Sequence, residues 1–553
     1  MTIETLYPFN PSLLTTNMVP NDDDMHRIRE TCAEHSQDLS RMNAQIERLQ
    51  ASLDAIILKR DTLQSKLSSL QSIMSPLRTL PPEVLQAVFM HCLELFPIIS
   101  AREAPVLLTR ICSKWRSVAI DTPALWASFH VALTGARHPF ESYDSTCNAI
   151  RDGLQTFLLR SSPLPVNVSL CSGYYSPGPY SEDMTGEVNR TLDVIVPHHK
   201  RWKYINLQLP AQCMDSVEHL RGEDLPNLET AVISCSHGVS LQPVVASPFF
   251  ENAPRLQRLS LWARDHAVMF KLIGSASWAR LTHFIICFSY WEESSTVLEQ
   301  IAMLRVCVNL EECTITLPGI NSETPPPLTN LAITLPKLKK IVIDCFFPSQ
   351  VMTSLLDSLV LPELRELILD GNLAQLPLNV SVILSATNLL QKSSCSLTHF
   401  GFRGNLGRPF PLPLSWDNGA MVFLLRLMPE LNTLNLSHTE LMTEALLEAF
   451  CTVSPDSGEI LCPKLAQIEF SDSAAITEQK LVHFISTRLS PPTSSAVAPL
   501  DRVLIRDPRP SAGSILSQFG DSVQLSTPWY DGTCHDQSFR RPTSQLPEGV
   551  PVF

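Results

Sequence analysis

A short apolar pattern recurs through most of the chain and constrains the fold more than any other feature. From about residue 200, the unit L-x-x-φ-x-φ, in which φ is an apolar residue, is repeated along the sequence. The clearest copies begin at Leu256, Leu338, Leu364 and Leu431. Weaker copies begin at Trp202, Leu228, Leu281, Leu310, Leu397, Leu465 and Leu500, so successive units start 25 to 35 residues apart. A repeat of this length is typical of a solenoid, in which each unit buries its apolar face against its neighbours.

Amphipathic stretches lie between these copies, and one of them carries Val351, Leu355 and Leu359 at helical spacing. One short strand followed by one helix in each unit resembles the leucine-rich repeat family. This resemblance implies an α/β solenoid over residues 130–506, with short parallel strands along a concave wall. Its first strand is expected at residues 163–170, where apolar and polar residues alternate. The asparagine that usually follows the strand in this family is mostly absent, so we expect an irregular solenoid.

The strands predict which side chains face outward. The starting leucine and the φ positions are expected to face the core, and the residues between them the concave side, because strand side chains alternate. A mixed polar surface of this kind suits recognition of another protein. The candidate substrate-binding residues are Tyr204, Arg258, Trp262, His283, Lys340, Glu366, Asp370 and Arg403. A solvated strand face without any partner is the alternative for each of these residues.

A second apolar segment, residues 76–129, has a different character. Pro81 and Pro82 suit the first turn of a helix, where an N–H group would have no partner. Leu85, Val88 and Phe89 then recur at helical spacing, and a second helix is expected to carry Leu107, Leu108, Ile111 and Trp115. Two or three short helices cannot bury this much apolar surface among themselves. One face is therefore expected to cover another surface.

This segment resembles the F-box, a small helical module. The matching residues are Leu80-Pro81-x-Glu83-Val84-Leu85, the pair Leu107/Leu108, Ile111-Cys112-x-x-Trp115-Arg116 and Pro123-x-Leu125-Trp126. The resemblance implies docking on the Skp-type adaptor of a Skp–cullin–F-box ubiquitin ligase complex. The adaptor-binding residues it implies are Leu80, Pro81, Leu85, Val88, Phe89, Leu107 and Leu108. A helical subdomain packed only on its own chain is the alternative.

A heptad pattern precedes this module. Apolar residues recur at alternating steps of three and four from Met25 to Met74, interrupted by His35 and Arg60, and no glycine or proline occurs among them. The pattern predicts one coiled-coil helix over residues 22–75, which self-associates through residues 25–74 or packs on its own chain. Charge does not determine whether two such helices would pair parallel or antiparallel. In a parallel dimer, none of the residue pairs that flank the apolar seam would be an ion pair. These pairs are Asp38–Asn43, Gln45–Gln50, Lys59–Gln64 and Lys66–Gln71.

Composition excludes several classes of protein. A net charge of −13 argues against broad binding to nucleic acid or to an anionic membrane. No apolar run is long enough to cross a membrane, and the first residues lack the features of a signal peptide. The 15 cysteines include no C-x-x-C pair, as expected for reduced thiols in the cytoplasm or nucleus. Residues 1–21 are expected to form a flexible tail, and the proline-rich residues 507–553 an extended one.

No motif for catalysis or for a cofactor is recognisable. The chain has no G-x-x-x-x-G-K-[ST] phosphate loop and no G-x-S-x-G nucleophile elbow, and His198-His199 lacks further ligands at zinc-site spacing. We therefore expect a protein that is not an enzyme and holds no metal or cofactor. The F-box resemblance implies a substrate-recognition subunit of an E3 ubiquitin ligase. A coiled-coil and repeat scaffold that binds proteins without ubiquitin transfer is the alternative.

Overall fold

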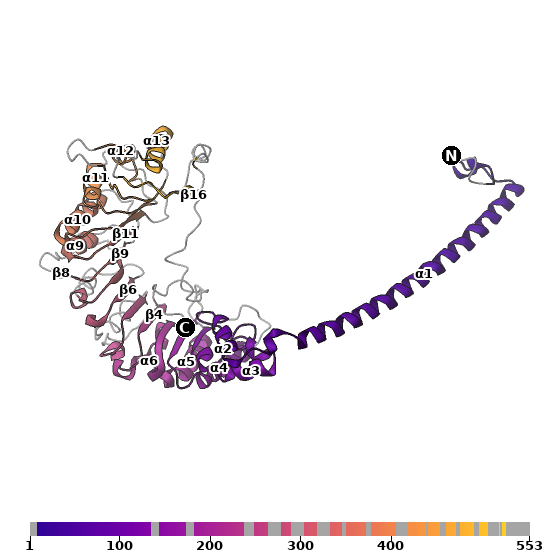
Figure 1. Cartoon of the computed structure of the whole chain (residues 1–553), viewed down its shortest axis with the longest axis horizontal. Coiled ribbons are helices and arrows are strands. Elements are labelled where there is room, and N and C mark those ends of the chain that lie inside the picture. The colour runs from indigo at the N-terminus through magenta and orange to yellow at the C-terminus, as the bar shows by residue number, and fades with distance from the viewer. Residues whose placement is uncertain are drawn as a thin grey trace. The chain divides into compact units, whose positions relative to one another are not determined.

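The computed structural model describes residues 8–133, 143–172, 182–236, 248–263, 278–288, 303–317, 332–345, 350–371, 378–404, 418–437, 441–453, 460–471, 476–491, 497–506, 519 and 522–526. Within these ranges the chain combines a long N-terminal helix with a large parallel sheet (Figure 1). It forms two compact units, Met1–Leu85 and Gln86–Phe553.

The first unit consists mainly of α1, Asp22–Ile73. The Asn21 side chain caps its start by accepting a hydrogen bond from the Asp24 N–H at 2.7 Å. The helix runs without a break to Ile73, and the short 3₁₀-helix η3, Pro76–Arg78, follows it. The predicted continuous helix is confirmed, and no α1 residue is buried. Within the expected N-terminal tail, Pro11–Leu14 form a single 3₁₀ turn, η2.

In the second unit, parallel strands follow one another in chain order to form a 14-stranded sheet among the described residues. Its strands are β1 Ser128–Leu133, β2 Val166–Ser172, β3 Trp202–Pro210, β4 Thr230–Ser236, β5 Arg258–Ala263, β6 His283–Phe288, β7 Glu312–Leu317, β9 Lys340–Cys345, β11 Glu366–Gly371, β12 His399–Gly404, β13 Thr433–Leu436, β14 Gln467–Ser471, β15 Arg502–Arg506 and β16 Val523–Ser526. Two short strands, β8 Ile333–Thr334 and β10 Leu359–Val360, pair separately.

Helices connect many of these strands, and within this unit α9, α10 and α11 lie on the outer side of the curved sheet (Figure 1). The α-helices are α2 Pro82–His91, which spans the boundary between the units, α3 Ser113–Ile120, α4 Tyr143–Arg160, α5 Glu182–Ile195, α6 Asp215–Glu218, α9 Gln350–Ser358, α10 Leu378–Ser393, α11 Asn418–Arg426, α12 Glu444–Ala449 and α13 Glu478–Leu489. The 3₁₀-helices are η4 Leu107–Arg110, η5 Pro123–Trp126, η6 Val196–Arg201, η7 Ala211–Cys213, η8 Gly222–Asp224, η9 Pro248–Phe250, η10 Trp278–Arg280 and η11 Leu304–Val306.

One backbone hydrogen bond marks each step of the repeat. The residue after each starting position donates its N–H to the carbonyl of the equivalent residue in the preceding unit. This bond recurs from Glu229, which donates to Lys203, through to Asp501, which donates to Ala466, at 2.7 to 3.0 Å. The starting leucines Leu256, Leu338 and Leu364 are buried beneath the sheet. The sequence repeat therefore coincides with the strand repeat, as expected for a solenoid-like fold.

Three elements differ from the sequence-based expectation. The first strand is β1, Ser128–Leu133, and the run at residues 163–170 contributes to the second strand instead. The second helix of the apolar segment is split into η4 and α3, because Cys112 takes an extended conformation and its Sγ accepts the Trp115 N–H at 3.5 Å. The range expected to be an extended tail contributes β16, which pairs with β15.

Candidate functional site

The side of the sheet that faces away from the core is a ladder of polar side chains, named here the concave strand face. Because the strands are in register, one residue of each strand of this sheet from β3 to β14 lies beside its counterparts, and in every strand of this row except β3 it is the first residue. The row in order is Tyr204, Thr230, Arg258, His283, Glu312, Lys340, Glu366, His399, Thr433 and Gln467. Most of these side chains are half-buried, as the predicted alternation requires.

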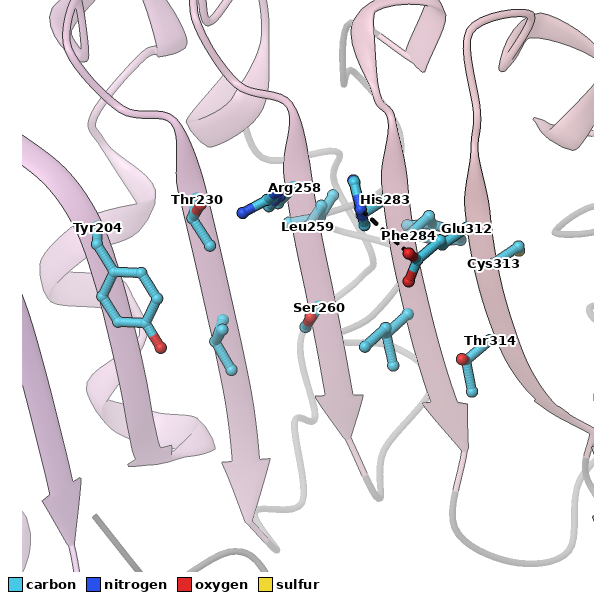
Figure 2. Close-up of a pocket in the computed structure, with 12 residues that line it drawn as sticks. Tyr204, Thr230, Arg258, Leu259, Ser260, His283, Phe284, Glu312, Cys313 and Thr314 are labelled. Atoms are coloured by element: carbon cyan, nitrogen blue, oxygen red, sulfur yellow. Dashed lines mark ion pairs between the residues drawn. The ribbon is translucent and has the colours of Figure 1, made fainter. Parts of the chain in front are cut away.

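A shallow pocket of about 60 Å³ lies on this face across β3 to β7. Figure 2 shows Arg258, His283 and Glu312 on three successive strands at the same level of the sheet. The His283 Nε2 lies 3.6 Å from a Glu312 carboxylate oxygen. The close approach of His283 lowers the pKa of the Glu312 carboxyl, although burial opposes the shift. The pocket offers polar groups of both signs, but its volume is far below that of a typical small-molecule site.

A second polar cluster lies further along the strands, on β7, β9, β11 and β12. The Arg403 Nη2 donates to the Asp370 Oδ2 at 2.6 Å, and the Thr316 hydroxyl donates to the Asp344 Oδ2 at 3.5 Å. Burial and, to a smaller extent, the neighbouring Asp370 raise the pKa of the Asp344 carboxyl to about 6. The Thr316 hydrogen bond and the charge of Arg403 act in the opposite direction.

This raised pKa predicts that Asp344→Asn stabilises the chain at pH 7.5 by on the order of 2 kcal/mol, with little effect near pH 4. An unfolded aspartate has a pKa of about 3.9. Between pH 4 and 6 the folded chain therefore binds more protons than the unfolded chain, and stability falls as pH rises through this window. The carboxamide removes this penalty because it does not ionise. Urea unfolding of the parent and variant at both pH values checks the expectation.

Asp370→Asn is the matched control, since it removes a carboxylate that Arg403 uses. We expect this change to destabilise the chain at pH 7.5. If the Asp344→Asn variant kept the pH dependence of the parent, the raised pKa of Asp344 would be contradicted.

The structure brings some of the candidate substrate-binding residues together and covers another. Lys340 Nζ and Glu366 Oε2 lie 3.0 Å apart, and Asp370 pairs with Arg403. Arg258, Trp262 and His283 are half-buried on the same face. Tyr204 is only 7% exposed, because its ring packs on Phe96 with the centroids 4.9 Å apart. Little of Tyr204 is accessible to a ligand.

The candidate adaptor-binding residues divide by exposure. Leu85, Phe89 and Leu108 are buried, so they can support a docking surface from beneath but present no accessible side chain to a partner. Pro81 is exposed and Leu80 is half-buried. In the second unit, Val88 and Leu107 are 42% and 39% exposed.

Sequence reasoning left out several exposed apolar residues of this segment as docking candidates, among them Ile111 and Val84. Ile111 is 55% exposed and lies four residues after Leu107, and Val84 is 43% exposed and lies four residues before Val88 on α2. The helical spacing of Val84 and Val88 places them on one face of their helix, which the sequence alone could have indicated. Exposure, by contrast, could not be inferred from spacing.

Aromatic side chains hold this segment of the second unit together. Phe89 packs on Trp115 with ring centroids 4.9 Å apart. Trp126 is buried, its Nε1 donates to the Ala119 carbonyl at 2.8 Å, and its ring packs edge-on against Phe157 of α4. The segment therefore continues directly into the first helix of the repeat region.

Among the described residues, no group of three or more His, Cys, Asp or Glu side chains is arranged to hold a metal ion. Burial raises the pKa of Cys171 and Cys307 to about 12. These two thiols are therefore weak nucleophiles at neutral pH. No helix in the described ranges is both long and apolar enough to span a membrane.

Comparison with known proteins identifies no family for the chain. No protein-family model matches it, and no curated protein matches it. Among solved structures, the chain is similar to one titled as the crystal structure of the Rad7 and Elc1 complex in yeast. That similarity covers 85% of this chain and 96% of the other, with 11% sequence identity and a TM-score of 0.34.

Proposed function

We propose that the chain is a substrate-recognition subunit of a Skp–cullin–F-box type E3 ubiquitin ligase, acting in the cytoplasm or nucleus. In this proposal, residues 76–129 bind the Skp-type adaptor and the concave strand face binds a protein substrate. The chain itself makes and breaks no covalent bond. It raises the local concentration of the substrate beside a catalytic partner.

The observation that carries the proposal is the exposure of apolar side chains on a segment whose sequence resembles the F-box. Val88, Leu107 and Ile111 are exposed, whereas Phe89 and Trp126 are buried. The segment thus has an internal core and still presents apolar groups to solvent, which is typical of a docking surface. The polar ladder on the strands supports the second half of the proposal, because mixed polar surfaces are common where proteins bind one another.

Replacing Leu107 or Ile111 by aspartate is expected to weaken binding to a purified Skp-type adaptor roughly tenfold or more. Burial of a large apolar side chain contributes about 1.5–3 kcal/mol, and an added charge disfavours burial further. Binding is measured by calorimetry on the full chain, with thermal melting beside it. Leu384→Asp on α10 is the matched control, because Leu384 is 51% exposed and lies outside the segment.

We expect the Leu384→Asp variant to bind the adaptor as tightly as the parent. The proposal fails if the parent chain does not bind the adaptor, or if neither aspartate variant in the segment weakens binding while melting is unchanged.

The alternative is a coiled-coil scaffold without ubiquitin transfer, and the lack of any buried residue on α1 favours it. Deleting residues 1–74 discriminates between the two. A substrate-recognition subunit keeps its adaptor binding without α1, since residues 76–129 remain. A scaffold loses its partner and shows no adaptor binding in either form.

A further inference from the structure

The α1 helix presents a long apolar seam that is exposed from Leu39 to Leu70. The helix is 52 residues long, or about 78 Å at 1.5 Å per residue. Six of its seam residues, Leu39, Ile46, Leu53, Ile56, Leu63 and Leu67, are each more than half exposed. An apolar surface of this extent marks an interaction site.

We propose that α1 pairs with α1 of a second copy of the chain, as an antiparallel coiled coil in which Ile46 faces Leu49 of the second copy. In this register each of the remaining apolar seam residues from 25 to 70 also faces an apolar seam residue of the second copy. The remaining layers between copies are Met25 with Leu70, Ile28 with Leu67, Cys32 with Leu63, Leu39 with Ile56, and Met42 with Leu53.

The two interruptions of the seam select this register. His35 and Arg60 face each other between copies, where a neutral imidazole nitrogen can accept a hydrogen bond from the guanidinium. In a parallel dimer, Arg60 instead faces Arg60, and like charges at a seam position repel. Moving the antiparallel register by one heptad places Arg60 opposite Ile28 or Met42, which leaves the guanidinium in an apolar layer without an acceptor.

Charge on the flanks agrees with the antiparallel orientation. Asp38 and Lys59 occupy the same heptad position beside the apolar seam. In this register, Asp38 of one copy and Lys59 of the other lie at nearly the same height along the facing helices. The two-fold symmetry of the pair repeats the contact. A parallel dimer would instead place each of them beside a neutral residue. Asp38 lies 3.2 Å from Arg41 within its own helix, but both side chains are exposed, so a second cation can approach the carboxylate.

A disulfide between copies tests the orientation in the full chain, because Cys32 is itself a seam residue and is free and exposed. The variant Leu63→Cys adds a thiol opposite it. The two positions are roughly 45 Å apart within one helix, so a bond between them must join two copies. After mild oxidation, peptide mass spectrometry is expected to find Cys32 joined to position 63. Light scattering on the unmodified chain is expected to give the mass of a dimer.

Bonds that join Cys32 to Cys32, or position 63 to position 63, would show a parallel pair and overturn the proposal. A monomer mass for the unmodified chain would overturn it equally. The latter result would leave α1 to pack on its own chain or on a different protein.

A charge exchange tests the register independently. Asp38→Lys or Lys59→Asp alone should weaken the dimer roughly two- to tenfold, since each exposed ion pair contributes a fraction of a kcal/mol and two are lost. The double variant should recover the parent affinity, because the pair is restored with its signs exchanged. Asp54→Lys, on the outward side of the helix, is the control and should have no effect. A double variant no tighter than the single ones would exclude the Asp38–Lys59 contact and this register.

Discussion

Replacing Arg488 by alanine is expected to destabilise the C-terminal repeats by about 3–5 kcal/mol. Arg488 lies on α13 and is 1% exposed. Its Nη1 donates to the carbonyls of Phe450 and Leu461 at 3.2 and 3.5 Å, and its Nη2 to those of Cys462 and Leu465 at 3.3 and 3.2 Å. Alanine would leave four carbonyls without this donor and would also create a cavity.

The Arg488→Met variant separates these two causes, because methionine occupies much of the volume but donates no hydrogen bond. Burial lowers the pKa of the Arg488 guanidinium, because desolvation disfavours its charged form. Methionine removes that cost, so we expect it to destabilise less than alanine but still measurably. Arg488→Lys keeps a charge without the planar fork and should also lose stability.

Hydrogen exchange of the β14 and β15 amides is the measurement for this series, with β3 and β4 as an internal control. Units of a repeat fold depend mainly on their neighbours, so protection should fall at the C-terminal strands and remain at the distant ones. If Arg488→Met kept full protection of β14 and β15, the carbonyl contacts would contribute no net stability.

Replacing Trp126 by alanine is expected to cost about 3–5 kcal/mol and to unfold the segment that precedes the sheet. Trp126 is 1% exposed, and its indole N–H donates to the Ala119 carbonyl. Its ring lies 4.9 Å from that of Phe157, and the Arg160 guanidinium lies 4.4 Å from the ring centre. Truncation therefore removes a packed ring, a hydrogen bond and a cation–π contact together.

Trp126→Phe is the matched control, because it keeps an aromatic ring beside Phe157 and loses only the N–H group and part of the volume. We expect it to cost clearly less than the alanine change. Trp115→Ala should also cost less, since Trp115 is only half-buried. Thermal melting and near-ultraviolet circular dichroism report the loss. A Trp126→Ala chain that melts like the parent would show that this residue does not hold the segment together.

The local pattern of the sequence determined the repeat and the long helix. Leucines spaced like Leu338 and Leu364 recur because each unit must bury the same inward positions, and the backbone bonds between units follow that spacing. The heptads of α1 predicted a single helix, since no residue interrupts its hydrogen bonds. The outward positions on strands such as β9 followed from alternation alone, because successive strand side chains point to opposite faces.

Tertiary structure decided which of the outward or apolar residues remain accessible. Tyr204 occupies an outward position, but Phe96, more than a hundred residues earlier in the sequence, covers it. Phe89 is buried while Val88 beside it is exposed, although both belong to the same apolar pattern. The pairing of Asp370 with Arg403 and the raised pKa of Asp344 also arise between neighbouring strands. Periodicity describes only neighbours along the chain, whereas exposure and charge pairing depend on residues that lie one or more repeats away.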